Sequence, residues 1–146
     1  MKKNRIIVIC TANSARSQIA EGFFRGYADD SLEVFSAGTF PSSVHPVAIE
    51  VMQEKGIDIS KHTSNSVHEY VEEFFDYVIT VCDSAKENCP VFYNASHQIH
   101  TGFIDPVSAA GNDKTIQEGF RIVRDMIEMS VIAFLKEHKW FRESSR

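Results

Sequence analysis

The sequence predicts an α/β fold, a single three-layer domain built on a four-stranded parallel sheet with helices on both faces. Two observations support this prediction. Apolar stretches typical of buried strands alternate with stretches of helical periodicity, and a chain of 146 residues has about the length of one ordinary domain. Strands that alternate with helices pair in parallel and carry the helices on the faces of the sheet. We therefore expect residues 1–146 to form one catalytic domain with the strand order 2-1-3-4.

The first half of the chain contains two strand patterns and two helix patterns. Residues 5–10 are dominated by a continuous apolar run, which is typical of a strand buried on both faces. Apolar residues then recur at helical spacing over 17–27, and residues 32–36 predict a second strand. The next helix should begin at Pro46, which suits a first helical turn, and stop at Gly56.

The second half of the chain predicts two further strands and a long helix. Residues 76–81 are rich in β-formers, and residues 98–101 predict a shorter fourth strand. Apolar residues at helical spacing over 116–134 predict a long amphipathic helix. Thr115 and Glu118 form a capping-box pattern at its start.

Chemically active residues follow the predicted strands at one edge of the sheet. Ligands of open parallel sheets bind beyond the carboxyl ends of the strands. Cys10, Ser36 and Cys82 stand at the ends of the first three strands, and Asp105 follows the fourth by a few residues. We therefore expect two cysteines and one loop carboxylate to lie close together.

The segment between the first strand and the first helix has the pattern of an oxyanion-binding loop (a P-loop). Five residues separate Cys10 from Arg16. Backbone N–H groups of such a loop converge on an anion, and a guanidinium binds two of its oxygens. The same positive field favours the Cys10 thiolate, to which Ser17 can donate a hydrogen bond, while Asn13 suits a left-handed conformation. The predicted oxyanion-binding residues are Thr11, Ala12, Asn13, Ser14, Ala15, Arg16 and Ser17.

The composition excludes several classes of function. Lys plus Arg number 15 and Asp plus Glu number 20, so the formal net charge of −5 disfavours binding to nucleic acid or to an anionic membrane. The apolar run Ile6 to Cys10 is too short for a membrane span or a secretory signal. We therefore expect a cytoplasmic protein that acts as a monomer. In that reducing environment, three cysteines indicate free, reactive or metal-bound thiols and not structural disulfides.

Six segments of the sequence form a set of motifs: residues 10–22, 34–39, 56–60, 75–82, 89–92 and 105–106. Through these motifs the chain resembles, over almost its whole length, the low-molecular-weight protein tyrosine phosphatase superfamily, and within it the thioredoxin-coupled arsenate reductases. The order and the spacing of the motifs match as well as their content. The resemblance implies an oxidoreductase of arsenical resistance on a low-molecular-weight phosphatase fold.

The resemblance also implies a role for each of five residues. Cys10 would attack arsenate, Arg16 would hold the arsenate oxygens, and Asp105 would protonate the oxygen that leaves as water. Cys82 would then attack the Cys10 adduct and release arsenite, and Cys89 would take over the bond to Cys82. Thioredoxin would reduce this redox-active disulfide, although the sequence leaves a glutaredoxin system open as the donor. Phosphate and sulfate are expected to mimic arsenate.

Simple geometry bears on this relay. Neighbouring strands lie ~4.8 Å apart, so Cys10 and Cys82 can approach the ~4.4–6.8 Å Cα separation of a disulfide if their strands are neighbours. A continuous helix over 84–88 would separate the Cα atoms of Cys82 and Cys89 by ~10 Å. A disulfide between these two cysteines therefore requires the segment between them to unwind.

A low-molecular-weight tyrosine phosphatase is the main alternative function. It would use Cys10, Arg16 and Asp105 to form a phosphocysteine that water hydrolyses. Such an enzyme would not need the two further cysteines. Residues 107–110 also lack the aromatic side chains that would clamp a phenyl ring, so we favour the reductase.

The sequence offers two candidate metal sites. Cys82, Cys89, His97 and His100 resemble a set of zinc ligands, but six residues separate the cysteines where zinc sites usually have two to four. Some of the similar reductases hold potassium at positions that map to Asn13, Glu21, Ser36 and Asn65. The last position carries an amide here in place of an acid, which weakens the case for potassium, and no tightly bound cofactor is expected.

Overall fold

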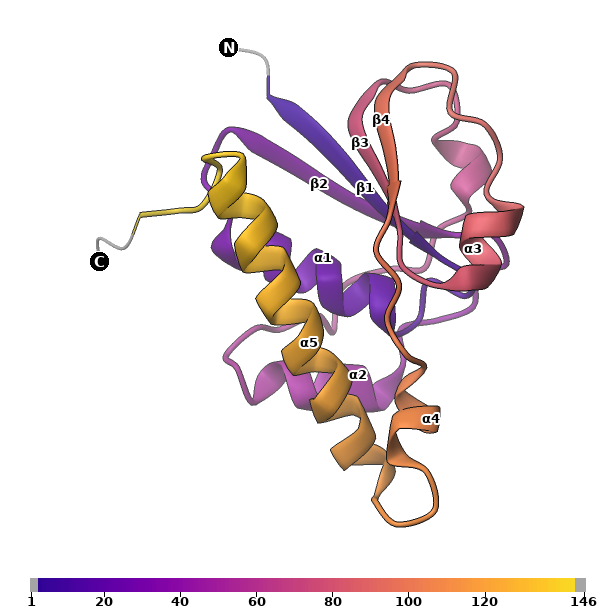
Figure 1. Cartoon of the computed structure of the whole chain (residues 1–146), viewed down its shortest axis with the longest axis vertical. Helices are drawn as coiled ribbons and strands as arrows, with labels where there is room; N and C mark the ends of the chain where they lie inside the picture. The colour runs from indigo at the N-terminus through magenta and orange to yellow at the C-terminus, as the bar shows by residue number, and fades with distance from the viewer. Residues whose placement is uncertain (1–2, 144–146) are drawn as a thin grey trace.

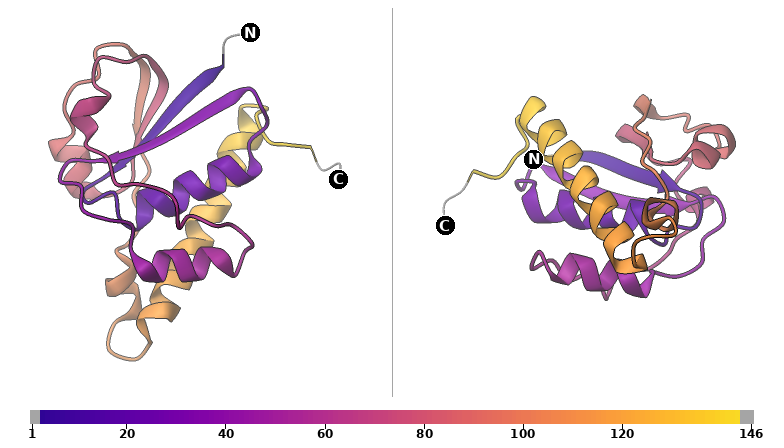
Figure 2. Two further views of the ribbon diagram at one scale, coloured as in Figure 1. Left: turned by 180° about the vertical axis from the view of Figure 1, so that it is seen from behind. Right: turned by 60° about the horizontal axis from the view of Figure 1, so that its bottom comes forward.

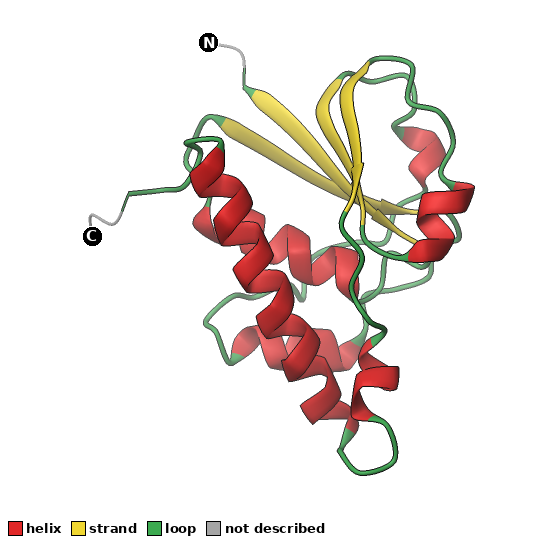
Figure 3. Ribbon diagram, viewed as in Figure 1, coloured by secondary structure: helices red, strands yellow, loops and turns green. Residues whose placement is uncertain are grey.

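The computed structural model describes residues 3–143 and contains one four-stranded parallel sheet in the order β2-β1-β3-β4 (Figure 1). The strands are β1 (Asn4–Cys10), β2 (Leu32–Gly38), β3 (Phe75–Thr80) and β4 (Ala95–His100). The helices are α1 (Arg16–Tyr27), α2 (Pro46–Gln53), the 3-10 helix η1 (Val67–Glu69), α3 (Asp83–Asn88), α4 (Pro106–Ala110) and α5 (Ile116–Glu137). The alternation of strands and helices (Figure 3) confirms the predicted fold class, and the pairing of the strands confirms the predicted strand order.

β1 lies in the middle of the sheet because its side chains are apolar on both faces. Its four residues from Ile6 to Ile9 are fully buried. They pair with β3 on one side, and β1 pairs over its whole length with β2 on the other. This register places Cys10 opposite Gly38 at the carboxyl edge of the sheet.

The two faces of the sheet are covered in different ways. Figure 2 shows α1, α2 and α5 grouped on one side of the sheet, away from α3. An aromatic cluster closes the other face, where Phe35 and Phe75 pack with ring centroids 5.6 Å apart. Tyr70, which follows η1, and Phe92, which follows α3, pack on the same Phe75 ring. The second face is therefore covered by short elements and the segments around them.

The helix ends follow the sequence signals. The Thr115 hydroxyl accepts a hydrogen bond from the Glu118 backbone N–H at 3.1 Å, and the Glu118 carboxylate accepts one from the Thr115 N–H at 2.8 Å. This confirms the capping box of α5. α2 ends at Gln53, and its chain turns at Gly56, whose φ of +75° lies in the left-handed region that favours glycine. None of the helices over residues 3–143 is both long and apolar enough to cross a membrane.

Several elements differ from the prediction. The sequence predicted neither η1 nor α4, considered α3 only as a condition over 84–88, and gave other bounds to β4. β4 covers Ala95–His100, although the sequence predicted a strand over 98–101. The reason is that β4 is an edge strand whose side chains are mostly exposed and polar, so apolar periodicity does not mark its start. α4 was not predicted. It is a single short turn of helix that begins because the Asp105 carboxylate accepts the Val107 N–H at 2.8 Å, with Pro106 at the first helical position.

Candidate active site

The loop between β1 and α1, residues 10–16, has its carbonyl groups held from outside. Four backbone N–H groups of the 39–45 segment donate to carbonyl oxygens of the loop. The pairs are Thr39 to Cys10 (3.2 Å), Phe40 to Thr11 (2.8 Å), Ser42 to Ala12 (3.0 Å) and His45 to Ser14 (2.9 Å). A trans peptide points its C=O and the following N–H in opposite directions. The N–H groups that follow these four carbonyls, those of Thr11, Ala12, Asn13 and Ala15, therefore turn away from the 39–45 segment. This arrangement suits an oxyanion.

Asn13 is the residue at which this loop reverses direction. Its φ of +49° confirms the left-handed conformation expected for it. Its carbonyl oxygen accepts hydrogen bonds from Gln18 Nε2 at 3.0 Å and from Ser64 Oγ at 2.6 Å. Gly38 allows the close approach of β2, because a Cβ there would lie 2.5 Å from the Thr11 carbonyl oxygen. The sequence analysis did not identify Gln18, Ser64 or the 39–45 segment as parts of the site.

A directed chain of hydrogen bonds ends at the Cys10 sulfur. Asn13 Oδ1 accepts the Asn65 N–H at 2.9 Å, which fixes the orientation of the amide. Asn13 Nδ2 then donates to Ser17 Oγ at 2.8 Å and to Ser36 Oγ at 2.9 Å. Ser17 is fully buried, and its oxygen lies 2.9 Å from Cys10 Sγ. The Ser17 hydroxyl is therefore placed to donate a hydrogen bond to a sulfur that acts as a nucleophile.

Cys10, Arg16 and Asp105 line one cavity of about 210 Å³. Arg16 Nη1 donates to the Phe103 carbonyl oxygen at 2.9 Å, and Nη2 lies 4.0 Å from Asp105 Oδ2. Asp105 is half exposed at the start of α4. The structure therefore brings together the thiol, the guanidinium and the carboxyl that the sequence places at the carboxyl edge of the sheet.

The two remaining cysteines stand at the two ends of α3. Cys82 is buried, and its sulfur lies 3.3 Å from Thr11 Oγ1, directly beside the Cys10 loop. Cys89 is half-buried at the other end of the helix, and its thiol donates to the Pro90 carbonyl oxygen at 3.4 Å. Burial raises the pKa of the Cys89 thiol to about 11. The folded α3 thus keeps Cys89 in its thiol form and apart from Cys82.

Alkylation of Cys89 is expected to be slow in the folded protein. Iodoacetamide reacts with the thiolate, and a pKa of about 11 in place of 9.0 leaves roughly a hundredfold less thiolate at pH 8. The rate, followed by mass spectrometry in a Cys10→Ser/Cys82→Ser variant, should rise about tenfold per pH unit up to the pKa. Unfolding the variant in urea at pH 8 should restore the rate of an exposed thiol. Equal rates in the folded and unfolded protein would contradict the burial of Cys89.

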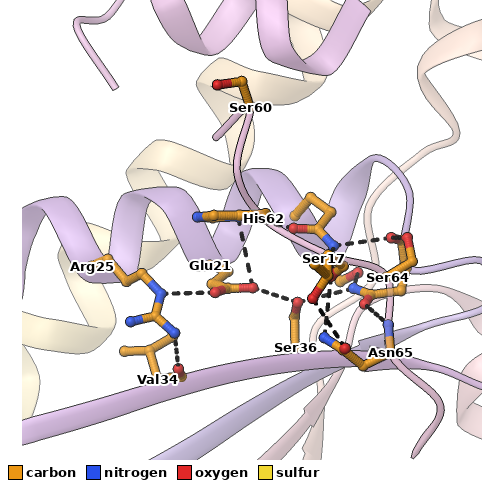
Figure 4. A network of polar contacts seen from close by, with 12 residues as sticks. Ser17, Glu21, Arg25, Val34, Ser36, Ser60, His62, Ser64 and Asn65 are labelled. Atoms are coloured by element: carbon orange, nitrogen blue, oxygen red, sulfur yellow. Dashed lines mark hydrogen bonds and ion pairs between the residues drawn. The ribbon is translucent and has the colours of Figure 1, made fainter. Parts of the chain in front are cut away.

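The four residues that map to a potassium site do converge, and their oxygens already accept hydrogen bonds. Glu21 Oε1 accepts the Ser36 hydroxyl at 2.5 Å, and Glu21 Oε2 accepts Arg25 Nε at 2.7 Å (Figure 4). Asn13 presents its NH₂ group to Ser36, and its oxygen is used by the Asn65 N–H. Hard cations need free oxygen ligands, and a guanidinium already neutralises the only carboxylate of the set. The arrangement therefore offers a potassium ion one carboxylate that is already paired with a guanidinium, and it adds no support to that site.

The zinc interpretation fails on geometry. Among residues 3–143, no group of three or more His, Cys, Asp or Glu side chains is placed to hold a metal ion. His100 has other partners: its Nδ1 lies 2.9 Å from Thr80 Oγ1, and its Nε2 lies 3.3 Å from the Asp83 carboxylate.

The sequence matches one protein family and a set of named relatives. The profile of the family described as low molecular weight phosphotyrosine protein phosphatase matches residues 5–143. An arsenate reductase of Halalkalibacterium halodurans is 39% identical over 139 residues, which cover 95% of this chain and 100% of the relative. Arsenate reductase 1 of Staphylococcus epidermidis is 42% identical over 134 residues, covering 92% of this chain and 97% of the relative.

Solved structures are similar as well. An arsenate reductase in the oxidized state superimposes with a TM-score of 0.76 at 31% identity, over 92% of this chain and 98% of the other. A thioredoxin-dependent arsenate reductase of Corynebacterium glutamicum superimposes with a TM-score of 0.69 at 27% identity, over 94% of this chain and 63% of the other.

Proposed function

The chain belongs to the low molecular weight phosphotyrosine protein phosphatase family, and from this membership we propose that it is an arsenate reductase coupled to thioredoxin. One observation carries the proposal: a second buried thiol, Cys82, lies 3.3 Å from Thr11 Oγ1, beside the loop that holds Cys10. A phosphatase needs a single thiol at an oxyanion site, whereas a reductase needs a second thiol that can attack the first. The names of the relatives support the same reaction.

The first step forms a covalent adduct on Cys10. Arsenate binds among the N–H groups of the loop, and Arg16 holds its oxygens with a planar fork. The Cys10 thiolate attacks arsenic, an S–As bond forms and an As–O bond breaks. Asp105 donates a proton to the departing oxygen, which leaves as water.

The next steps transfer the oxidation from arsenic to sulfur. Cys82 attacks the Cys10 sulfur, so that an S–S bond forms and the S–As bond breaks. The electron pair of that bond stays on arsenic, which is reduced from As(V) to As(III) and leaves as arsenite. Cys89 then attacks Cys82 and frees the Cys10 thiolate, and a dithiol reductant such as thioredoxin reduces the Cys82–Cys89 disulfide. This relay starts from three reduced cysteines and therefore suits the reducing cytoplasm.

Asp105→Asn is expected to slow adduct formation by roughly 10²–10⁴-fold, because general acid catalysis contributes about that much. Phosphate affinity should stay close to that of the wild type, since the loop and Arg16 are untouched. The amide side chain of this variant also keeps an oxygen for the Val107 N–H, so α4 should persist. Single-turnover mass spectrometry of the arsenylated Cys10 measures the rate. An unchanged rate would show that a group other than Asp105 is the general acid.

The function itself is tested by parallel turnover assays. Arsenate reduction is followed with thioredoxin plus thioredoxin reductase, and separately with glutathione plus glutaredoxin. Hydrolysis of a phosphotyrosine analogue is measured on the same preparation. We expect multiple turnovers of arsenate with the thioredoxin system and slow hydrolysis of the ester. Efficient hydrolysis without arsenate turnover would make the protein a phosphatase.

A further inference from the structure

His45 lines the same cavity as Cys10, Arg16 and Asp105, although the proposed steps give it no role. It stands directly before Pro46 at the start of α2. Its backbone N–H donates to the Ser14 carbonyl oxygen at 2.9 Å, which ties the residue to the oxyanion loop. The backbone of His45 is therefore held by the same set of contacts that shapes the loop.

The protonation pattern of the His45 ring follows from its helix contact. Nδ1 accepts the Val47 backbone N–H at 3.0 Å and so caps α2. A ring nitrogen that accepts a hydrogen bond carries no proton, so the proton of the neutral ring is on Nε2. The ring also packs on Phe120 with centroids 4.7 Å apart. A ring flip would break the cap, so this tautomer and orientation are maintained together.

Nε2 of His45 is a hydrogen-bond donor that the protein leaves unused. Over residues 3–143, no side chain or backbone group forms a hydrogen bond with it. Among the described residues that line the cavity, Arg16 is the only one with a fixed positive charge, and several other walls are apolar, including Ala12, Val107 and Phe120. A second donor on a separate element would therefore complement the oxygens of a tetrahedral anion that the loop and Arg16 leave free.

We propose that His45 is a substrate-binding residue, whose Nε2–H donates to an oxygen of the oxyanion held at Cys10. The ligand class is a tetrahedral oxyanion, arsenate in turnover and phosphate as its unreactive mimic. This assignment rests on the proposed function, because it concerns the same site. His45 binds a non-reacting oxygen, so it holds the substrate and leaves the bond-breaking steps to Cys10 and Asp105.

The test separates this role from that of helix capping. His45→Asn keeps a strong N-cap, because asparagine accepts the Val47 N–H well, but its shorter side chain lacks the Nε2–H. His45→Ala loses both the cap and the donor. The expected phosphate Kd, measured by titration calorimetry, is about tenfold weaker in both variants, since a hydrogen bond to a charged group is removed. The melting temperature should fall only in His45→Ala.

Turnover and spectroscopy give independent measurements. The KM for arsenate should rise about tenfold in His45→Asn while kcat stays within about twofold, because a contact made equally in the ground and transition states is lost. The imidazole ¹⁵N signal of His45 should shift when phosphate is added to the wild type. His68→Asn is the matched control, since His68 is exposed on η1 and outside the cavity. It should leave Kd and KM unchanged.

The outcomes distinguish the proposal from the function on which it rests. A wild-type phosphate Kd in His45→Asn, with no ¹⁵N shift, would reduce His45 to a helix cap and overturn the proposal. A wild-type protein that does not bind phosphate would overturn both the oxyanion site and the role of His45. A protein that binds phosphate through His45 but does not reduce arsenate would retain the proposal and lose the function.

Discussion

The Cys89→Ser variant is expected to reduce one equivalent of arsenate and then to stop, with Cys10 and Cys82 joined in a disulfide. Cys82 lies beside the Cys10 loop in the folded protein, so its attack needs no large movement. The resulting Cys10–Cys82 bond is resolved only by a further thiolate. Without Cys89 the chain has no third thiol, because the sequence contains three cysteines in all. Multiple turnover with thioredoxin should therefore be lost.

Mass mapping of disulfides after an acid quench and alkylation decides this prediction. Cys82→Ser should stop one step earlier, with arsenic still on Cys10 and no arsenite released. The wild type without a reductant should end with a Cys82–Cys89 disulfide. Repeated turnover by both serine variants would show that the relay is wrong and would favour a phosphatase-like enzyme.

Arg16→Lys is expected to lower kcat/KM for arsenate by about 10²–10³-fold, the usual cost of removing an oxyanion donor. The guanidinium of Arg16 is held by the Phe103 carbonyl oxygen and faces the cavity beside Asp105. A lysine supplies the same charge but neither the planar fork nor the second oriented donor. The loss should appear in adduct formation, because all later steps depend on it.

A second arginine provides the matched control. Arg121 is half-exposed on α5, pairs with Glu54, and does not line the cavity that holds Cys10 and Arg16. Arg121→Lys should keep kcat/KM within about twofold, as is typical of surface positions. Arg16→Lys should also keep the wild-type melting temperature to within a few degrees. An Arg16→Lys enzyme with near-wild-type kcat/KM would remove Arg16 from the oxyanion site.

The parts of the structure that the sequence predicted are those encoded by side-chain pattern. The apolar run of β1 predicted a strand buried on both faces, and β1 lies inside the sheet. The parallel topology then predicted that Cys10, Cys82 and Asp105 lie at one edge. β4 was placed incorrectly because a polar edge strand has no apolar period. α4 was missed because five residues are too few for helical periodicity.

The parts of the site that the sequence did not predict act through the backbone. The 39–45 segment holds the oxyanion loop with main-chain N–H groups, which every residue type except proline supplies. The only residue-level sign of this contact is Gly38, where a Cβ would collide with the Thr11 carbonyl oxygen. The charge balance at Glu21 was missed although a signal existed, because Glu21 and Arg25 stand four residues apart on the predicted helix, the spacing of an ion pair.

The shortness of α3 has a consequence for the energy landscape of the enzyme. Of its six residues only Ala85 is buried, and helices shorter than about 12–15 residues are marginal without tertiary packing. The free energy needed to open this segment locally is therefore small, well below the free energy of global unfolding. In the proposed relay, the Cys82–Cys89 disulfide would form from an open conformer of this segment. Substitutions that stabilise α3 would raise thermal stability but lower turnover, because they would reduce the population of the open conformer that the proposed relay needs.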